Sequence, residues 1–157
     1  MAMPTPANSN KPEAEETGGE GRMSAVLARA EAAVADLAKD YGSWALGDLA
    51  KARTALTAAA DDPTQRARHV EALFRVAHDL KGQGASFGFP LVTKIGQSLC
   101  VLTRDRARDY QARHLELAKS HLDAIELVLT KSIKGEGGKV GAELVAKLEL
   151  RVKELLG

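Results

Sequence analysis

The feature that most constrains the fold of this chain is the spacing of its apolar residues. From Met23 almost to the C-terminus they recur every three or four positions, which places them along one face of an α-helix. The alternating apolar and polar runs that half-buried β-strands need are missing from the sequence. Much of the apolar content is alanine and leucine, the residues that favour helices most. The sequence therefore predicts an all-α protein.

Turn and cap signals divide this pattern into six helices. Gly42 suits the left-handed position that ends a helix, and Ser43 can cap the next one. Asp61-Asp62-Pro63 ends the second helix and starts the third, because Asp62 is a good N-cap and Pro63 fits the first turn. Gly88-Phe89-Pro90 is a tight stop and start, so the fourth helix should fold back antiparallel. We expect the third helix at residues 63–87, the fifth at about 106–133, and a short terminal helix after the glycine-rich loop at 135–138.

Short connections between these helices predict an up-and-down antiparallel four-helix bundle with additional N- and C-terminal helices. Residues 1–22 are rich in Pro, Glu, Asn and Gly, and we expect them to form a disordered tail. Residues 23–157 should form one helical domain, with the bundle core at about 48–133.

Charge and cysteine content exclude several classes of function. The 22 basic and 21 acidic residues give a net charge of +1, which offers no basic surface for nucleic acid or for a membrane. Cys100 is the only cysteine, so an internal disulfide and a cysteine-rich zinc site are excluded. No apolar run is long enough to span a bilayer, and the N-terminus lacks a secretory signal. We therefore expect a cytoplasmic protein without a metal site. His69, His114 and His121 are interpreted as surface or packing histidines.

The segment from Ala77 to Gly88 is unusual because it places Gly82 and Gly84 inside a predicted helix. Each interior glycine costs about 1 kcal/mol relative to alanine. A glycine is useful there when another group must approach the helix closely. The two glycines therefore indicate a functional segment.

His78 is the candidate reactive group of this segment. Residues three and four positions away share its face, so Phe74, Lys81 and Gly82 are its neighbours. Gly82 and Ala85 leave a low surface beside the imidazole. A neutral imidazole is a nucleophile, and the Lys81 ammonium could stabilise phosphoryl oxygens by a charge-assisted hydrogen bond. These parts suit a histidine that takes up a phosphoryl group.

The pattern His78-x-Leu80-Lys81-Gly82, followed by small residues and Gly88, resembles the signature of histidine phosphotransfer (HPt) domains. The resemblance covers about residues 48–133. It implies reversible phosphoryl transfer between His78 and a receiver-domain aspartate, with Mg²⁺ held by the receiver and no cofactor or kinase activity in this chain. The implied partners are response-regulator receiver domains and a sensor (hybrid) histidine kinase, and the carrier itself is expected to be a monomer.

The resemblance also suggests a supporting hydrogen bond. Many family members place a glutamine on the following helix, facing the histidine. Gln97 is the nearest candidate here, one turn from the expected position, and Cys100 is the alternative occupant of that position.

Two alternatives to a phosphorelay carrier remain open. One is a non-catalytic helical adaptor that binds a signalling partner through an apolar face. The other is a stand-alone relative of the phosphorylated domain of chemotaxis-type kinases, which the stretch from Gly84 to Phe89 also resembles. The presence of His78 in its motif favours a carrier over an adaptor.

Overall fold

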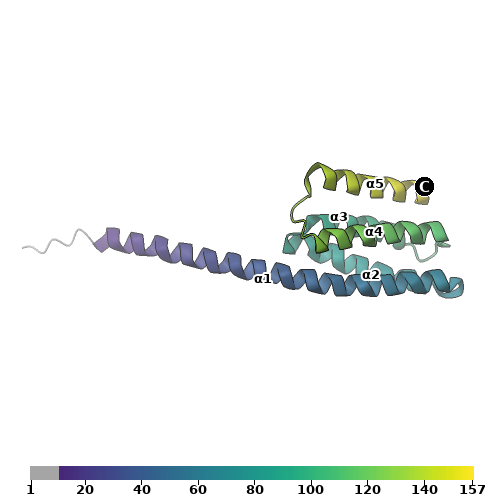
Figure 1. Cartoon of the computed structure of the whole chain (residues 1–157), viewed down its shortest axis with the longest axis horizontal. Helices are drawn as coiled ribbons and strands as arrows, with labels where there is room; N and C mark the ends of the chain where they lie inside the picture. The colour runs from purple at the N-terminus through teal and green to yellow at the C-terminus, as the bar shows by residue number, and fades with distance from the viewer. Residues whose placement is uncertain (1–10) are drawn as a thin grey trace, which may run out of the picture. The chain divides into compact units, whose positions relative to one another are not determined.

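The computed structural model describes residues 11–157 and shows only helices in that range (Figure 1). The α-helices are α1 (Lys11–Asp61), α2 (Arg66–Gly84), α3 (Pro90–Thr103), α4 (Ala112–Thr130) and α5 (Gly138–Leu156). Two short 3-10 helices, η1 (Pro63–Gln65) and η2 (Ala85–Phe87), flank α2. The predicted all-α class is confirmed for the described residues.

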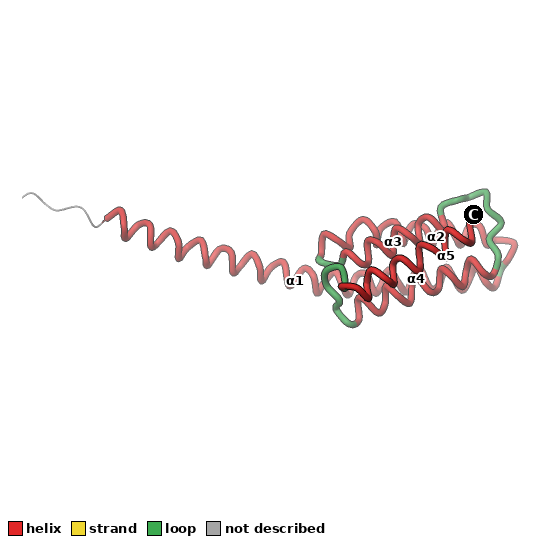
Figure 2. The backbone as a smooth tube through the Cα atoms, turned by 90° about the horizontal axis from the view of Figure 1, so that it is seen from above, coloured by secondary structure: helices red, strands yellow, loops and turns green. Residues whose placement is uncertain are grey.

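The chain divides into two units, with the boundary between Leu37 and Ala38. The larger unit, Ala38–Gly157, contains the core. In it α2 and α3 pack together, α4 packs on α3, and α5 packs on both α3 and α4 (Figures 1 and 2). The part of α1 in this unit is joined to α4 by Arg53, whose guanidinium lies 2.8 Å from Asp123 and 2.6 Å from Glu126.

The core is built from the apolar stripes that the sequence shows. The largest fully buried side chains in it are Tyr41, Leu73, Leu80, Ile95, Leu99, Leu102, Leu122 and Ile125, together with His121. Every α-helix of the larger unit contributes to the core, since Val145, Leu148 and Val152 of α5 are also buried. The burial of these side chains is the main favourable contribution to folding of this unit.

The predicted break at Gly42 is wrong, because α1 continues through it to Asp61. The buried residues Tyr41 and Ala45, on either side of Gly42, follow one helical stripe. One glycine costs a helix interior only about 1 kcal/mol, and packing of that stripe on the bundle outweighs this cost. The chain therefore has one helix where the sequence predicted two.

The helix predicted to begin near Arg106 begins later, at Ala112. Asp105 organises a turn instead: its carboxylate accepts a hydrogen bond from the Ala107 N–H at 3.0 Å. The Asp105 carbonyl accepts another from the Tyr110 hydroxyl at 3.0 Å. Short acidic side chains compete with helix formation in this way, which explains the late start.

Other predicted boundaries are confirmed. The Asp62 carboxylate accepts the Thr64 N–H at 3.2 Å, with Pro63 in the first turn of η1. Gly88 takes a left-handed φ of 89° between η2 and α3. The terminal helix α5 is longer than expected, at 19 residues.

The predicted disordered tail coincides only partly with the described residues. Residues 1–10 lie outside them, and from Lys11 the chain is helical. None of the helices in residues 11–157 combines the length and hydrophobicity that crossing a bilayer requires.

Candidate functional site

His78 lies on α2 at the edge of its buried face. Ala77 and Leu80 point into the core, whereas His78 is exposed. One turn earlier, the half-buried Phe74 places its ring centroid 6.1 Å from that of His78, at an angle of 47°. The imidazole is therefore supported on one side by an aromatic ring and open to solvent on the other.

The two glycines after His78 have different surroundings. A Cβ added to Gly82 would have no atom within 4 Å, so the surface one turn beyond His78 is open. A Cβ on Gly84 would lie 2.8 Å from Thr93 Oγ1 and 2.9 Å from the Phe89 carbonyl oxygen. Gly82 thus leaves space for an approaching group, whereas Gly84 allows α2 and α3 to touch.

Thr93 of α3 fixes this contact and was not recognised from the sequence. Its hydroxyl donates to the Lys81 carbonyl at 3.0 Å and accepts from the Ala85 N–H at 2.8 Å. One turn further, Gly96 packs on the Lys81 backbone, since an added Cβ would lie 3.1 Å from the Lys81 nitrogen. A glycine within the apolar stripe of α3 is the sequence signal that could have indicated this close approach.

Lys81 is half-buried, and no carboxylate of the described residues lies within ion-pair distance of its ammonium. Its charge acts on Cys100 of α3. Burial raises the pKa of the Cys100 thiol, and the positive charges of Lys81 and Arg104 partly oppose that rise. Arg104, at the end of α3, is thus a second cation whose charge acts on Cys100.

Gln97 and Ala85 occupy different surroundings. Ala85 is exposed at the start of η2, three positions after the open Gly82. Gln97 is exposed and lines a groove between α3 and α5 with Val152 and Lys153, and it forms no hydrogen bond with His78 in the described residues. Cys100, by contrast, is close enough to Lys81 to experience its charge.

The other histidines have structural surroundings. His121 is fully buried, with Nε2 2.9 Å from the Ser98 hydroxyl and Nδ1 2.7 Å from the Leu117 carbonyl. The buried His114 accepts the Gln111 N–H at 2.8 Å at the start of α4. Both are packing histidines, as predicted. His69 is half-buried on α2.

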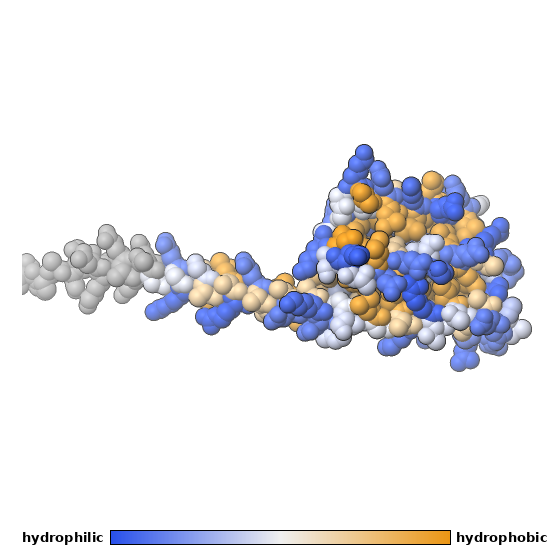
Figure 3. Space-filling model, viewed as in Figure 1, coloured by the Kyte–Doolittle hydropathy of each residue, from blue (hydrophilic) through white to orange (hydrophobic). Residues whose placement is uncertain are grey.

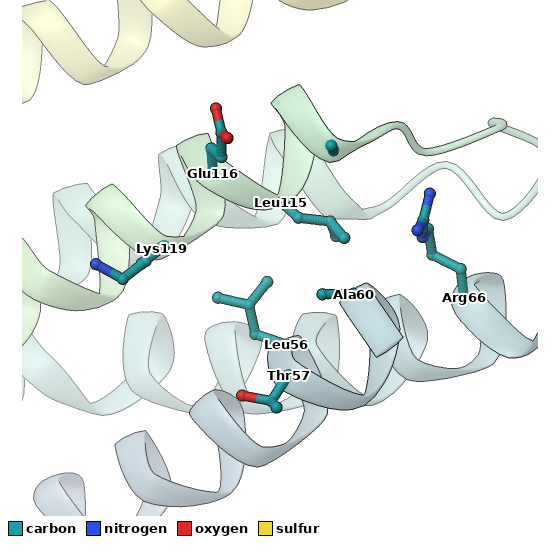
Figure 4. A pocket seen from close by; sticks show the side chains of 8 residues that line it. Leu56, Thr57, Ala60, Arg66, Leu115, Glu116 and Lys119 are labelled. Atoms are coloured by element: carbon teal, nitrogen blue, oxygen red, sulfur yellow. The ribbon is translucent and has the colours of Figure 1, made fainter. Parts of the chain in front are cut away.

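A separate groove lies between the end of α1 and the start of α4 (Figure 4). Leu56 and Ala60 of α1 face Leu115 of α4 there, with Arg66 at one end. His78 is twelve residues beyond Arg66, roughly 18 Å along α2, so this groove is not part of the His78 surface. In the described part of the chain no group of three His, Cys, Asp or Glu side chains could hold a metal ion.

An exposed histidine on an open helical surface is more typical of a carrier or binding module than of an enzyme with an enclosed pocket. The family model of the Hpt domain matches residues 24–128, about two thirds of the chain. The chain therefore belongs to the Hpt domain family and has a phosphotransfer role in two-component signalling. Domains of this family are phosphocarriers without kinase activity and interact with kinases and receiver domains. Neither the comparison with curated proteins nor that with solved structures finds a match.

Proposed function

We propose that this chain carries a phosphoryl group on His78 and exchanges it with aspartates of response-regulator receiver domains, in a cytoplasmic phosphorelay fed by a sensor (hybrid) histidine kinase. The observation that supports this assignment best is the exposed His78 imidazole beside the open surface over Gly82. His78 also lies inside the region that the family model matches.

The proposed reaction needs few groups from this chain. The unprotonated ring nitrogen of His78 attacks the phosphorus of an aspartyl phosphate. A nitrogen–phosphorus bond forms, the bond from phosphorus to the aspartate oxygen breaks, and the carboxylate leaves with the electron pair. The attacking nitrogen carries no proton, so the step needs no general base.

Lys81 is proposed to stabilise the phosphoryl oxygens during this step. It lies one turn from His78, and no ion pair within the described residues competes for its ammonium. Its backbone is held by Thr93 and Gly96, which limits how far the side chain can move away. The Mg²⁺ that helps neutralise the phosphoryl charge is expected on the receiver, so the two proteins together form one active site.

The helices are proposed to form an up-and-down four-helix bundle from α1 beyond Ala38, α2, α3 and α4, with α5 as an additional helix. In that arrangement the hydrogen bonds of Thr93 and the close contact at Gly96 brace the His78 segment of α2. Gly82 and Ala85 then form the exposed surface over which a receiver docks. Such an interface is expected to be small and transient.

The test is transfer of label from a radiolabelled, phosphorylated receiver domain to the full chain. We expect acid-labile, base-stable labelling of the wild type and none of His78→Gln. The matched control is His69→Gln, since His69 lies on the same helix and is half-buried, and it should be labelled like the wild type. Labelling of His78→Gln at the wild-type level would contradict the assignment. A wild type that binds receivers but is never labelled would favour an adaptor.

A further inference from the structure

The part of α1 before Ala38 carries an exposed apolar face. Met23 is 60% exposed, Leu27 54%, Val34 61% and Leu37 46%. Ala30, between them, is exposed as well. The helical segment that follows the grey residues in Figure 3 accordingly shows orange, hydrophobic atoms between blue, hydrophilic ones.

These residues follow a heptad pattern. The steps from Met23 to Leu27, Ala30, Val34 and Leu37 alternate between four and three residues. With Leu27 and Val34 at position a, the remaining three occupy position d. None of the a and d positions from Met23 to Leu37 holds a charged residue. The neighbouring charged residues occupy other heptad positions: Arg22, Arg29, Glu31, Asp36 and Lys39. A strict 3.5-residue repeat is matched by another helix with the same repeat, because a and d side chains then fill holes on the facing helix.

A second copy of the chain supplies such a helix. In the larger unit, Trp44 is exposed as well and lies on α1 seven positions after Leu37. The remaining large exposed hydrophobic residues are scattered over three helices: Leu46, Leu127, Val140 and Leu150. Single exposed residues of this kind form no seam. Among the described residues, the segment of α1 from Met23 to Leu37 is therefore the one that carries several exposed apolar side chains at heptad spacing.

The size of the surface also fits a dimer. Two paired segments would bury on the order of 1,000 Å² in total, near the lower limit for a specific protein interface. A helical segment as short as the one from Met23 to Leu37 is only marginally stable in water without a packed face. Pairing thus gives the exposed segment the tertiary contact that it otherwise lacks.

We propose that Met23, Leu27, Ala30, Val34 and Leu37 form a coiled-coil seam with the same segment of a second copy. The protein is then a homodimer rather than the expected monomer, and each dimer presents two His78 side chains. The proposal does not depend on phosphoryl transfer, because it concerns a different segment of the molecule.

Sedimentation equilibrium of the full chain, from low to high micromolar concentration, tests the dimer. The wild type should approach twice the monomer mass, whereas Leu27→Glu and Val34→Glu should remain monomeric throughout. The matched controls are Ala28→Glu and Ala35→Glu, which add the same charge one position away from the seam and should still dimerise. A wild type that stays monomeric at every concentration, or seam variants that dimerise like the controls, would overturn the proposal.

Amide hydrogen exchange separates a dimer from other arrangements without any substitution. Exchange in residues 23–37 of the wild type should slow as the protein concentration rises. Protection that does not change with concentration would mean that the segment packs within its own chain, and the proposal would be wrong. Absence of protection at high concentration would contradict it equally.

Discussion

At the scale of single residues, the site depends on glycines that look equivalent in the sequence but have opposite surroundings. Gly82 faces open space, and Gly84 touches the Thr93 side chain and the Phe89 backbone. The first leaves room for a partner, and the second lets α3 approach α2. The same substitution should therefore have opposite effects at the two positions.

Gly82→Ala should raise the free energy of unfolding by up to about 1 kcal/mol, because alanine is the better helix former and its Cβ meets nothing. Gly84→Ala should lower it by roughly 1–3 kcal/mol, because the new Cβ overlaps atoms of α3 and the backbone of Phe89 cannot move freely. Urea unfolding of both variants measures the difference. Equal effects would show that α2 and α3 do not meet at Gly84 as described.

Lys81→Ala should slow phosphoryl transfer to His78 roughly 10- to 100-fold, the value of one charge-assisted hydrogen bond in the transition state. Rapid-quench kinetics with a phosphorylated receiver measure the rate. Lys51→Ala, which removes an exposed lysine of α1 paired with Asp48, is the control and should transfer at the wild-type rate. If both variants behave alike, Lys81 has no role in transfer.

His121 should make stability depend on pH. Burial lowers the pKa of His121, and its hydrogen bond with the Leu117 carbonyl opposes this only in part. The folded protein therefore favours the neutral ring. The stability that the neutral His121 ring contributes is complete above the ordinary histidine pKa of about 6.5, and it is lost as the pH falls below that value.

Urea unfolding between about pH 7 and about pH 5 should show this loss in the wild type. In His121→Gln the slope of stability against pH should be smaller. It should not vanish, because burial also lowers the pKa of His114. An unchanged slope in the variant would indicate that His121 is not the group responsible.

At the scale of helices, α1 shows how packing overrides a local signal. Gly42 is a typical helix terminator, yet α1 passes through it, and the neighbouring Tyr41 and Ala45 are buried in the same core. At Gly88, by contrast, the backbone does turn, with φ at 89°. Glycine has the same propensity at both positions, so the difference comes from the contacts around it.

Gly42→Ala should therefore stabilise the protein by about 1 kcal/mol, since it replaces an interior helical glycine whose Cβ position is open. Gly88→Ala should destabilise it by about 1–2 kcal/mol, because alanine is strained at a left-handed φ. Thermal unfolding followed by circular dichroism would measure both. A loss of stability in Gly42→Ala would mean that α1 breaks there after all.

The start of α4 is a second case of the same kind. The apolar spacing near Arg106 is compatible with a helix, but the Asp105 carboxylate binds the Ala107 N–H and forms a turn. The buried Tyr110 then anchors this turn through its hydroxyl. A spacing pattern contains no information about such a side-chain to backbone bond, so the predicted boundary was too early.

At the scale of the whole molecule, the contacts that brace the site come from residues far apart in the sequence. Thr93 and Gly96 of α3 hold the backbone of Lys81 on α2, and Ser98 of α3 meets His121 of α4. None of these pairs follows from helical periodicity. Each pair forms because folding packs two helices together with these residues side by side.

The role of Gln97 illustrates this limit. The resemblance to HPt domains made Gln97 and Cys100 both candidates for the position that faces His78. In the structure Gln97 lines a groove against α5, while Cys100 lies near Lys81. The choice between neighbouring residues of a helix depends on its rotation about its axis, which packing decides.

Local chemistry was sufficient to predict the helical class and the caps at Asp62 and Gly88, and to propose the candidate segment around His78, because these depend on residues within one or two turns of each other. Tertiary structure was needed to show that α1 is continuous, that Gly84 and Gly96 serve helix contacts, and that the face from Met23 to Leu37 is exposed. The physical reason is that propensities of about 1 kcal/mol per residue are small beside the burial of a whole helix face, and burial is a property of the assembled helices.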